Sequence, residues 1–212
     1  NLSTSLYYSK VEDYWHKYYA NVNWALPISD KQGLVFDFNI YDTKSEGSAD
    51  YLAFDGDKLD NHAFSLSGAY NIGAHTFTLA YQKVTGHGDY GYGIDGGGTI
   101  FLANSVARSD FNAEDEKSWQ ARYDLNFAEY GIPGLTFMTR YVRGTDANVA
   151  GTSNGKEWER DVDIKYVLQS GPAKDLSFRV RQATYRSSDG VYYDSPSIDE
   201  LRLIVEYPLS IL

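Results

Sequence analysis

The fold is decided by the stretch Leu201–Leu212, LRLIVEYPLSIL. Its odd-numbered positions are apolar or aromatic, namely Leu201, Leu203, Val205, Tyr207, Leu209 and Ile211, whereas its even-numbered positions include Arg202, Glu206 and Ser210. Successive side chains of a β-strand point to opposite faces of a sheet. The alternation therefore predicts a strand with one apolar and one polar face.

The same two-residue period recurs along the chain, and helical periodicity is hard to find. In one example, Phe36, Phe38 and Ile40 alternate with Asp37 and Asn39. Ten strands are predicted in this way, near residues 2–10, 16–26, 34–40, 64–70, 77–82, 119–127, 135–141, 161–169, 176–181 and 201–212.

The connections between these strands alternate in length. Short turns rich in Gly, Pro, Asp and Asn are expected at residues 29–33, 71–74, 130–134 and 170–175. Longer links are expected at residues 42–61, 86–117, 144–157 and 187–199. Short turns on one side and long loops on the other are typical of a transmembrane antiparallel β-barrel. The alternative is a soluble β-sandwich or lipocalin-like barrel, in which the apolar face would point inward.

Composition narrows the class further. The chain has 212 residues, a formal net charge of −10 and no cysteine, and its mean hydropathy is −0.45. No run approaches the roughly 18 apolar residues of a membrane-spanning helix, and the acidic balance argues against nucleic-acid binding. The absence of cysteine excludes a disulfide scaffold. The chain opens within a predicted strand and shows no signal peptide, so we expect a mature chain or a piece of something longer.

Aromatic and charged residues favour the membrane barrel. The chain has 19 Tyr, 10 Phe and 4 Trp, and many lie near predicted strand ends, as in the aromatic girdles of outer-membrane barrels. The polar faces of consecutive strands carry basic residues, namely Arg122, Arg140, Lys165, Arg179, Arg181 and Arg202. Burying them in the dry interior of a soluble barrel would cost several kcal/mol each, whereas a water-filled lumen would not.

Several long blocks closely resemble the C-terminal part of OprD-family outer-membrane porins, which are substrate-specific channels. These blocks are DGGGTIFLANSVARSDF, EKSWQARYDLNFAEYGIPGLTFMTRYV, QSGPAKDLSFRVRQA and LRLIVEYPLSIL. The resemblance implies an outer-membrane location in a Gram-negative bacterium and an eighteen-stranded barrel about twice this length. Residues 1–212 would form a single β-barrel domain that is part of this barrel. Ten strands could instead close into a small barrel, because an open sheet in lipid would leave two unpaired edges.

The six basic residues are the predicted solute-binding site. Neighbouring strands lie about 4.8 Å apart, so the six side chains would form a basic ladder down one wall. A guanidinium matches a carboxylate, and the resemblance also implies a basic ladder that guides solutes bearing a carboxylate. In this resemblance Lys165, Arg179, Arg181 and Arg202 fall on matching blocks, and Arg122 and Arg140 lie further round. The alternative is that these cations pair with Asp124, Asp161, Asp163 and Glu206 and merely support the wall.

The segment Gly91–Gly96 matches the dinucleotide pattern G-x-G-x-x-G. It does not link a strand to a helix, which that fingerprint requires. It lies instead in the longest loop, residues 86–117, which we expect to fold toward the pore, with Ile100, Phe101 and Leu102 as anchors. The pore-loop candidates are Tyr90, Tyr92, Asp95, Gly96, Gly97, Gly98, Ser105 and Arg108. The acidic runs Glu114-Asp115-Glu116 and Asp199-Glu200 are expected to be solvated.

The expected function is passive, selective uptake of small carboxylate-bearing solutes. No cofactor, metal site or catalytic constellation is predicted, because the four histidines show no ligand spacing and no nucleophile has a base beside it. The expected partners are these solutes, outer-membrane lipid and lipopolysaccharide, and the expected state is a monomer or loose trimer. Two rival functions remain, an outer-membrane barrel enzyme and a soluble barrel that binds a ligand inside.

Overall fold

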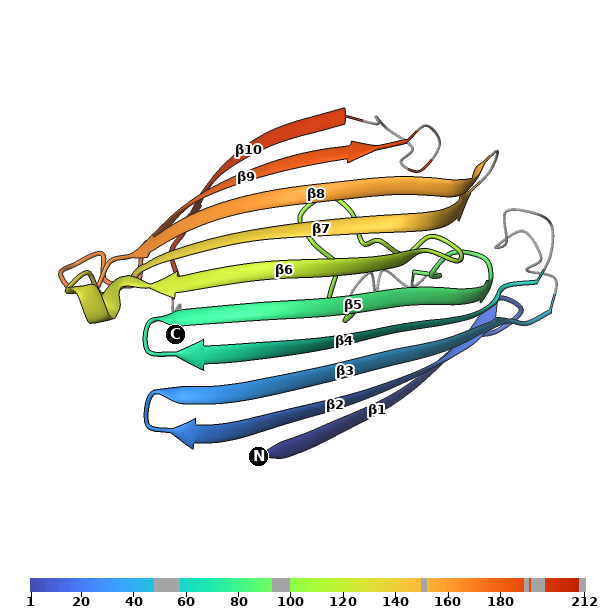
Figure 1. Ribbon diagram of the computed structural model, residues 1–212, viewed down its shortest axis with the longest axis horizontal. Coiled ribbons are helices and arrows are strands. Elements are labelled where there is room, and N and C mark those ends of the chain that lie inside the picture. The colour runs from blue at the N-terminus through green and yellow to red at the C-terminus, as the bar shows by residue number, and fades with distance from the viewer. Residues whose placement is uncertain (48–57, 93–99, 150–151, 189–190, 192–196, 210–212) are drawn as a thin grey trace.

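The ten strands form one antiparallel sheet in the order in which they occur along the chain. The computed structural model describes residues 1–47, 58–92, 100–149, 152–188, 191 and 197–209. The strands are β1 Leu2–Val11, β2 Trp15–Ser29, β3 Gln32–Ser45, β4 Asp60–Ile72, β5 His75–His87, β6 Lys117–Asn126, β7 Leu135–Val149, β8 Thr152–Val167, β9 Ser177–Ser187 and β10 Ser197–Glu206. Figure 1 shows them as a curved sheet.

The two faces of the sheet are reversed relative to a soluble protein. We call inner the face on which the segment after β5 packs, and outer the opposite face. Apolar side chains of the outer face are solvent-exposed, for example Leu79 at 69% and Leu203 at 74%. Polar side chains of the inner face, such as Gln82 and Glu159, are fully buried. A wide apolar outer surface fits lipid, so the predicted sides are confirmed and the soluble alternative fails.

Several strands extend further than the sequence pattern predicts. The link expected at residues 144–157 is mostly strand, because β7 continues to Val149 and β8 begins at Thr152, with register shifts on either side of Ala147. The buried inner positions of these extensions include small residues such as Gly144, Ala147 and Gly155, so the apolar–polar alternation that marks a strand is absent from the sequence. Phe127, expected at the end of a strand, instead starts the 3-10 turn Phe127–Tyr130.

The strands β1 and β10 lie at the two edges of the sheet (Figure 1), and no pairing joins them in the described residues. The alternative of a small closed ten-stranded barrel is therefore not adopted. An unpaired edge in lipid leaves backbone N–H and C=O groups without partners, so both edges require further strands to complete a barrel. Within the described residues, no helix has the length and apolar character needed to span a membrane.

Candidate functional site: the charged inner wall

All six residues of the predicted basic ladder lie on the inner face, on β6 to β10. Strand register brings them together: Arg122 lies opposite Arg140, Lys165 opposite Arg179, and Arg181 opposite Arg202. Pairing partners in a sheet lie about 5 Å apart, so the cations lie in facing pairs, with Asp161 and Asp163 of β8 between Arg140 and the arginines of β9. The strand parity read from the sequence positions these cations because inner-face residues recur at every second position.

Every one of the six cations has an acidic partner. The ion pairs are Arg122–Asp124 at 2.6 Å, Arg140–Asp161 at 2.6 Å, Arg179–Asp163 at 2.7 Å, Arg181–Asp163 at 3.0 Å, Lys165–Glu206 at 3.6 Å and Arg202–Glu200. Four of these five carboxylates are the ones that the wall-support alternative names. The wall is therefore a mixed array of charges. A solute can bind only to those cations that still have N–H groups without a partner in the wall.

Arg179 and Arg181 share a single carboxylate. Both donate from Nε to Asp163, whose side chain is only 6% exposed. Within the described part of the chain, the terminal Nη groups of these two arginines make no hydrogen bond, although the side chains are partly exposed. One carboxylate neutralises one charge, so this pair carries an excess positive charge. A guanidinium held through Nε still presents its Nη atoms to a second anion.

Arg140 has a different environment. Its side chain is 11% exposed, and its partner Asp161 is fully buried. A buried pair of this kind is strongly destabilised when one partner is removed, because the other is left as an uncompensated charge. We therefore assign Arg140 a supporting position in the wall.

A segment after β5 packs directly on the inner face; its described parts, residues 88–92 and 100–116, are called the inner segment. Gln82 of β5 is a central anchor. Its Nε2 donates to the backbone carbonyls of Asp110 at 2.7 Å and Phe111 at 2.8 Å, and its Oε1 accepts from the Asn104 backbone N–H at 2.9 Å. Asn104 donates in turn to Ser118 Oγ of β6. One side chain thus satisfies three backbone groups of the inner segment.

An apolar cluster fastens the other end of the inner segment. Its buried members are Tyr19, Tyr41, Ala63 and Val84 of the wall and Tyr90 and Leu102 of the inner segment, with Ile100 packed against them. The Nζ of buried Lys17 lies 4.2 Å from the ring centroid of Tyr90, which adds a cation–π contact. Of the three anchors expected from the sequence, Leu102 is buried, whereas Phe101 is 52% exposed.

Two glutamates of β8 hold the turn of the inner segment, and sequence reasoning missed both. Glu159 accepts the backbone N–H of Arg108 through Oε1 and that of Ser109 through Oε2, each at 2.9 Å. Glu157 accepts from Ser109 Oγ at 2.8 Å. The available signal was the run of acids at every second position, which places Glu157, Glu159, Asp161 and Asp163 on one face of one strand.

The described pore-loop candidates take several roles. Tyr90 is buried in the apolar cluster, and Tyr92 and Ser105 each donate a hydroxyl hydrogen bond to Asp110. Arg108 reaches β10, where its Nη1 lies 3.0 Å from Glu200 Oε2. The candidates Asp95, Gly96, Gly97 and Gly98 lie outside the described residues.

The prediction that the two acidic runs are solvated is wrong for Glu116 and Glu200, whereas Asp115 and Asp199 are exposed. Glu116 is fully buried, and Glu200 pairs on the inner face with Arg108 and Arg202. Burial raises the pKa of Glu116 well above its usual range, and the neighbouring Glu157 carboxylate adds to the increase. The packed inner segment therefore keeps a proton that the released segment loses above the ordinary glutamate pKa of about 4.3.

This proton gives a pH dependence with a definite sign. The stabilisation from protonated Glu116 is fully present below about pH 4.3 and is lost as the pH rises to the raised pKa. We expect hydrogen exchange of residues 100–116, corrected for the intrinsic rate, to become faster over that range. Glu116→Gln should reduce this dependence, whereas Asp115→Asn, at an exposed neighbouring position, should retain it in full. An unchanged slope in Glu116→Gln would contradict the assignment.

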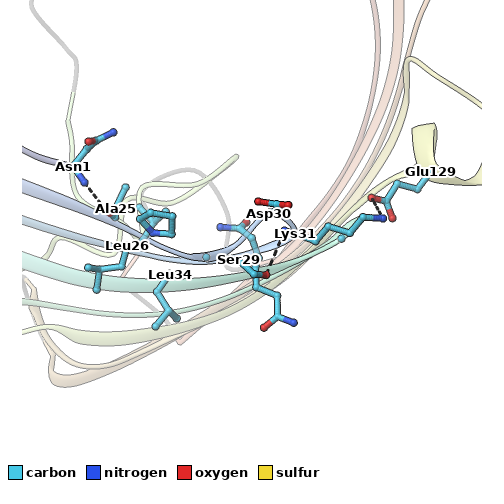
Figure 2. A pocket seen from close by; sticks show the side chains of 14 residues that line it. Asn1, Ala25, Leu26, Ser29, Asp30, Lys31, Leu34 and Glu129 are labelled. Atoms are coloured by element: carbon cyan, nitrogen blue, oxygen red, sulfur yellow. Dashed lines mark hydrogen bonds and ion pairs between the residues drawn. The ribbon is translucent and has the colours of Figure 1, made fainter.

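A hollow at the turn end of the sheet is a separate feature (Figure 2). Its labelled residues include Lys31, whose Nζ lies 3.8 Å from Glu129 Oε1, and Asn1, whose amino group donates to the Ala25 carbonyl. Its described lining includes none of the six basic residues of the inner wall, so it is not part of the charged site. No cluster of His, Cys, Asp and Glu in the described residues has the arrangement of a metal site.

An apolar outer face, a charged inner face and a segment folded onto that inner face define the class of outer-membrane β-barrel channels. The chain belongs to the OprD family: the family model described as outer membrane porin, OprD family, matches residues 1–211. This membership confirms the prediction of an outer-membrane porin that is not an enzyme, and it excludes the barrel-enzyme alternative.

Similar proteins agree with this assignment. Porin D of Pseudomonas aeruginosa is 51% identical over 234 residues, which cover 100% of this chain and 51% of that protein. Porin-like protein GalP of Pseudomonas putida is 34% identical over 206 residues, which cover 97% and 47%. A crystal structure of P. aeruginosa OprD matches with a TM-score of 0.88 and 49% identity, covering 100% of this chain and 58% of that chain. The chain spans about half the length of the curated relatives it matches.

Proposed function

We propose that the channel to which this chain contributes passes small carboxylate-bearing solutes, and that Arg179 and Arg181 are their main contact in this part of the wall. The observation that carries the proposal is the sharing of Asp163 by two guanidiniums. Their Nη groups remain for a solute, and a carboxylate accepts two parallel N–H bonds from such a fork.

The neighbouring cations extend this contact along the path of the solute. Arg202 lies opposite Arg181, and Lys165 lies opposite Arg179. The Nζ of Lys165 is 3.6 Å from Glu206, a longer separation than in the arginine pairs. Passage requires several weak sites, since one tight site would retain the solute. In this proposal Arg122 and Arg140 form the part of the ladder nearer the long loops, and Arg140 mainly supports the wall. The inner segment narrows the path beside them.

Neutralising the shared pair tests the proposal. Arg179→Gln with Arg181→Gln would leave Asp163 as an unpaired buried charge, so Asp163→Asn is included to protect folding. In this triple variant, we expect the anion preference from reversal potentials and the uptake of a small carboxylate such as benzoate to fall at least tenfold, because a single lost hydrogen bond to a charged group already costs about 1.5 kcal/mol. Arg160→Gln, on the outer face, is the matched control.

The single variant Asp163→Asn separates a solute site from mere wall support. It removes a negative charge and leaves both guanidiniums, so the anion preference should rise. A channel whose reversal potential and carboxylate uptake stay unchanged in both the single and the triple variant would refute the proposed contact.

A further inference from the structure

A belt of basic side chains lies on the outer face, at the level where the apolar band ends on the side of the long loops. Its members are Lys83, Lys117, Arg143, Lys156, Arg160 and Arg186. They belong to the outer face because strand register aligns Arg143 with the outward rings of Trp119 and Trp158. In outer-membrane barrels the long loops are extracellular, so this belt faces the outer leaflet.

Strand register organises the belt around an aromatic row. Trp119, Arg143, Trp158 and Arg186 are successive partners across β6 to β9. The ring of Trp158 stacks on Tyr141 with centroids 5.8 Å apart. Aromatic rings at this level mark the membrane interface, where the headgroups of lipids lie. The cations therefore lie at headgroup depth, with the exposed apolar band directly beside them.

A pocket opens between β7, β8 and β9 at this row. Its lining includes Arg143, Lys156 and Arg186, with Tyr141 and Trp158 between them. Glu157 also contributes to the lining, but its carboxylate hydrogen-bonds Ser109 and Tyr185 on the inner face. Adjacent strands are about 4.8 Å apart, so cations on three strands can converge on one group of phosphate size.

The charges of this pocket are only partly compensated. Arg186 pairs with Asp199 at 2.8 Å. Arg143 and Lys156 are exposed, and in the part of the chain that the structure describes neither side chain makes an ion pair or a hydrogen bond. Asp146, which pairs with Lys117, also interacts electrostatically with Lys156, so the four cations Lys117, Arg143, Lys156 and Arg186 face two carboxylates, Asp146 and Asp199, and an excess of positive charge remains. Such a position attracts anionic headgroups.

We propose that this pocket binds a phosphate group of the phosphorylated glycolipid of the outer leaflet, lipopolysaccharide. The guanidinium of Arg143 and the ammonium of Lys156 contact the phosphate oxygens, and the acyl chains lie on the apolar band below. A free phosphate ion would use the same cations, but it gains nothing from the adjacent apolar surface, so the lipid is the favoured source.

The test uses the detergent-solubilised channel that contains this chain, with binding measured by native mass spectrometry. The probes are purified bis-phosphorylated lipid A, its monophosphoryl form, phosphatidylglycerol and inorganic phosphate. We expect the bis-phosphorylated lipid to bind the unmodified channel most tightly and inorganic phosphate to bind least. Arg143→Gln with Lys156→Gln should weaken lipid A binding roughly 30-fold, because each cation near the headgroups contributes a factor of about five to the affinity for an anionic lipid.

Two matched variants make the result decisive. Lys44→Gln removes an outer-face cation that already pairs with Asp60, and it should leave lipid A binding unchanged. Arg143→Lys keeps the charge and should retain most of the binding. Equal lipid A binding by the unmodified channel and the double variant would overturn the site, provided both remain folded by heat-modifiable gel migration. Inorganic phosphate binding as tightly as lipid A, or phosphatidylglycerol doing so, would overturn the choice of ligand.

Discussion

Replacing Phe111 by alanine is expected to release the turn of the inner segment from the wall. Phe111 is fully buried, and a Cβ added at Gly144 of β7 would lie 2.9 Å from its ring, which shows how closely the ring packs on that strand. Truncation of a buried phenylalanine costs about 3–5 kcal/mol. This cost lowers the free energy needed to release the inner segment from the wall. The strands themselves are joined by backbone hydrogen bonds that do not involve this ring.

Hydrogen exchange and limited proteolysis of residues 100–116 measure this opening in the channel that contains the chain. An opening free energy lower by 3 kcal/mol corresponds to a rise of more than a hundredfold in exchange rate. Phe101→Ala is the matched control, since Phe101 lies in the same segment but is 52% exposed, and it should change exchange far less. Equal protection in the two variants would show that Phe111 does not fasten the segment.

The sides of the sheet follow from the sequence for a simple physical reason. Lipid and water meet alternate residues of each strand, so the parity of Leu201 and Leu203 against Arg202 predicts directions that the structure confirms. The prediction fails where this contrast is missing. In residues 144–149 and 152–157 the buried inner positions include small residues such as Gly144, Ala147 and Gly155, so the apolar–polar alternation that marks a strand is absent.

The contacts of the charged wall could not be predicted in the same way. Parity places Arg140 and Asp161 on the inner face, but the pairing depends on which residue of β8 lies opposite Arg140. That register results from turn geometry and packing along the whole hairpin, so one sequence leaves it open. The sequence shows acids at every second position of β8. Only the structure shows that Asp163 forms ion pairs with two arginines, whereas Glu157 and Glu159 accept hydrogen bonds from the inner segment.

The anchoring of the inner segment is also beyond sequence parity. Gln82 appears in the sequence as an ordinary polar residue of an inner face, where water would satisfy its amide. In the structure it is fully buried, because a segment distant in sequence covers it. Non-local hydrogen bonds of this kind depend on the path of a long loop, and loop composition alone does not specify that path.

Gln82→Leu is therefore expected to have a large effect on the same segment through a different mechanism. Leucine has a similar size but no hydrogen-bonding groups, so the carbonyls of Asp110 and Phe111 and the N–H of Asn104 lose their partner. An unsatisfied buried polar group costs about 1–3 kcal/mol, and three of them together cost about 3 kcal/mol or more. Water entering beneath the opened segment would relieve this cost, so exchange of residues 100–116 should rise strongly and single-channel recordings should show added current noise.

Ser65→Ala provides a graded comparison, because Ser65 Oγ accepts a single backbone hydrogen bond, from Ala103 N at 3.0 Å. If each orphaned backbone group contributes separately, the alanine variant should show about one third of the change in opening free energy seen in Gln82→Leu. The two variants leave the charged pair Arg179 and Arg181 untouched, so ion selectivity should change less than current noise. A Gln82→Leu channel with the noise and exchange of the unmodified protein would mean that the amide holds no part of the segment in place, and the fastening would then rest on the aromatic cluster and the glutamates of β8 alone.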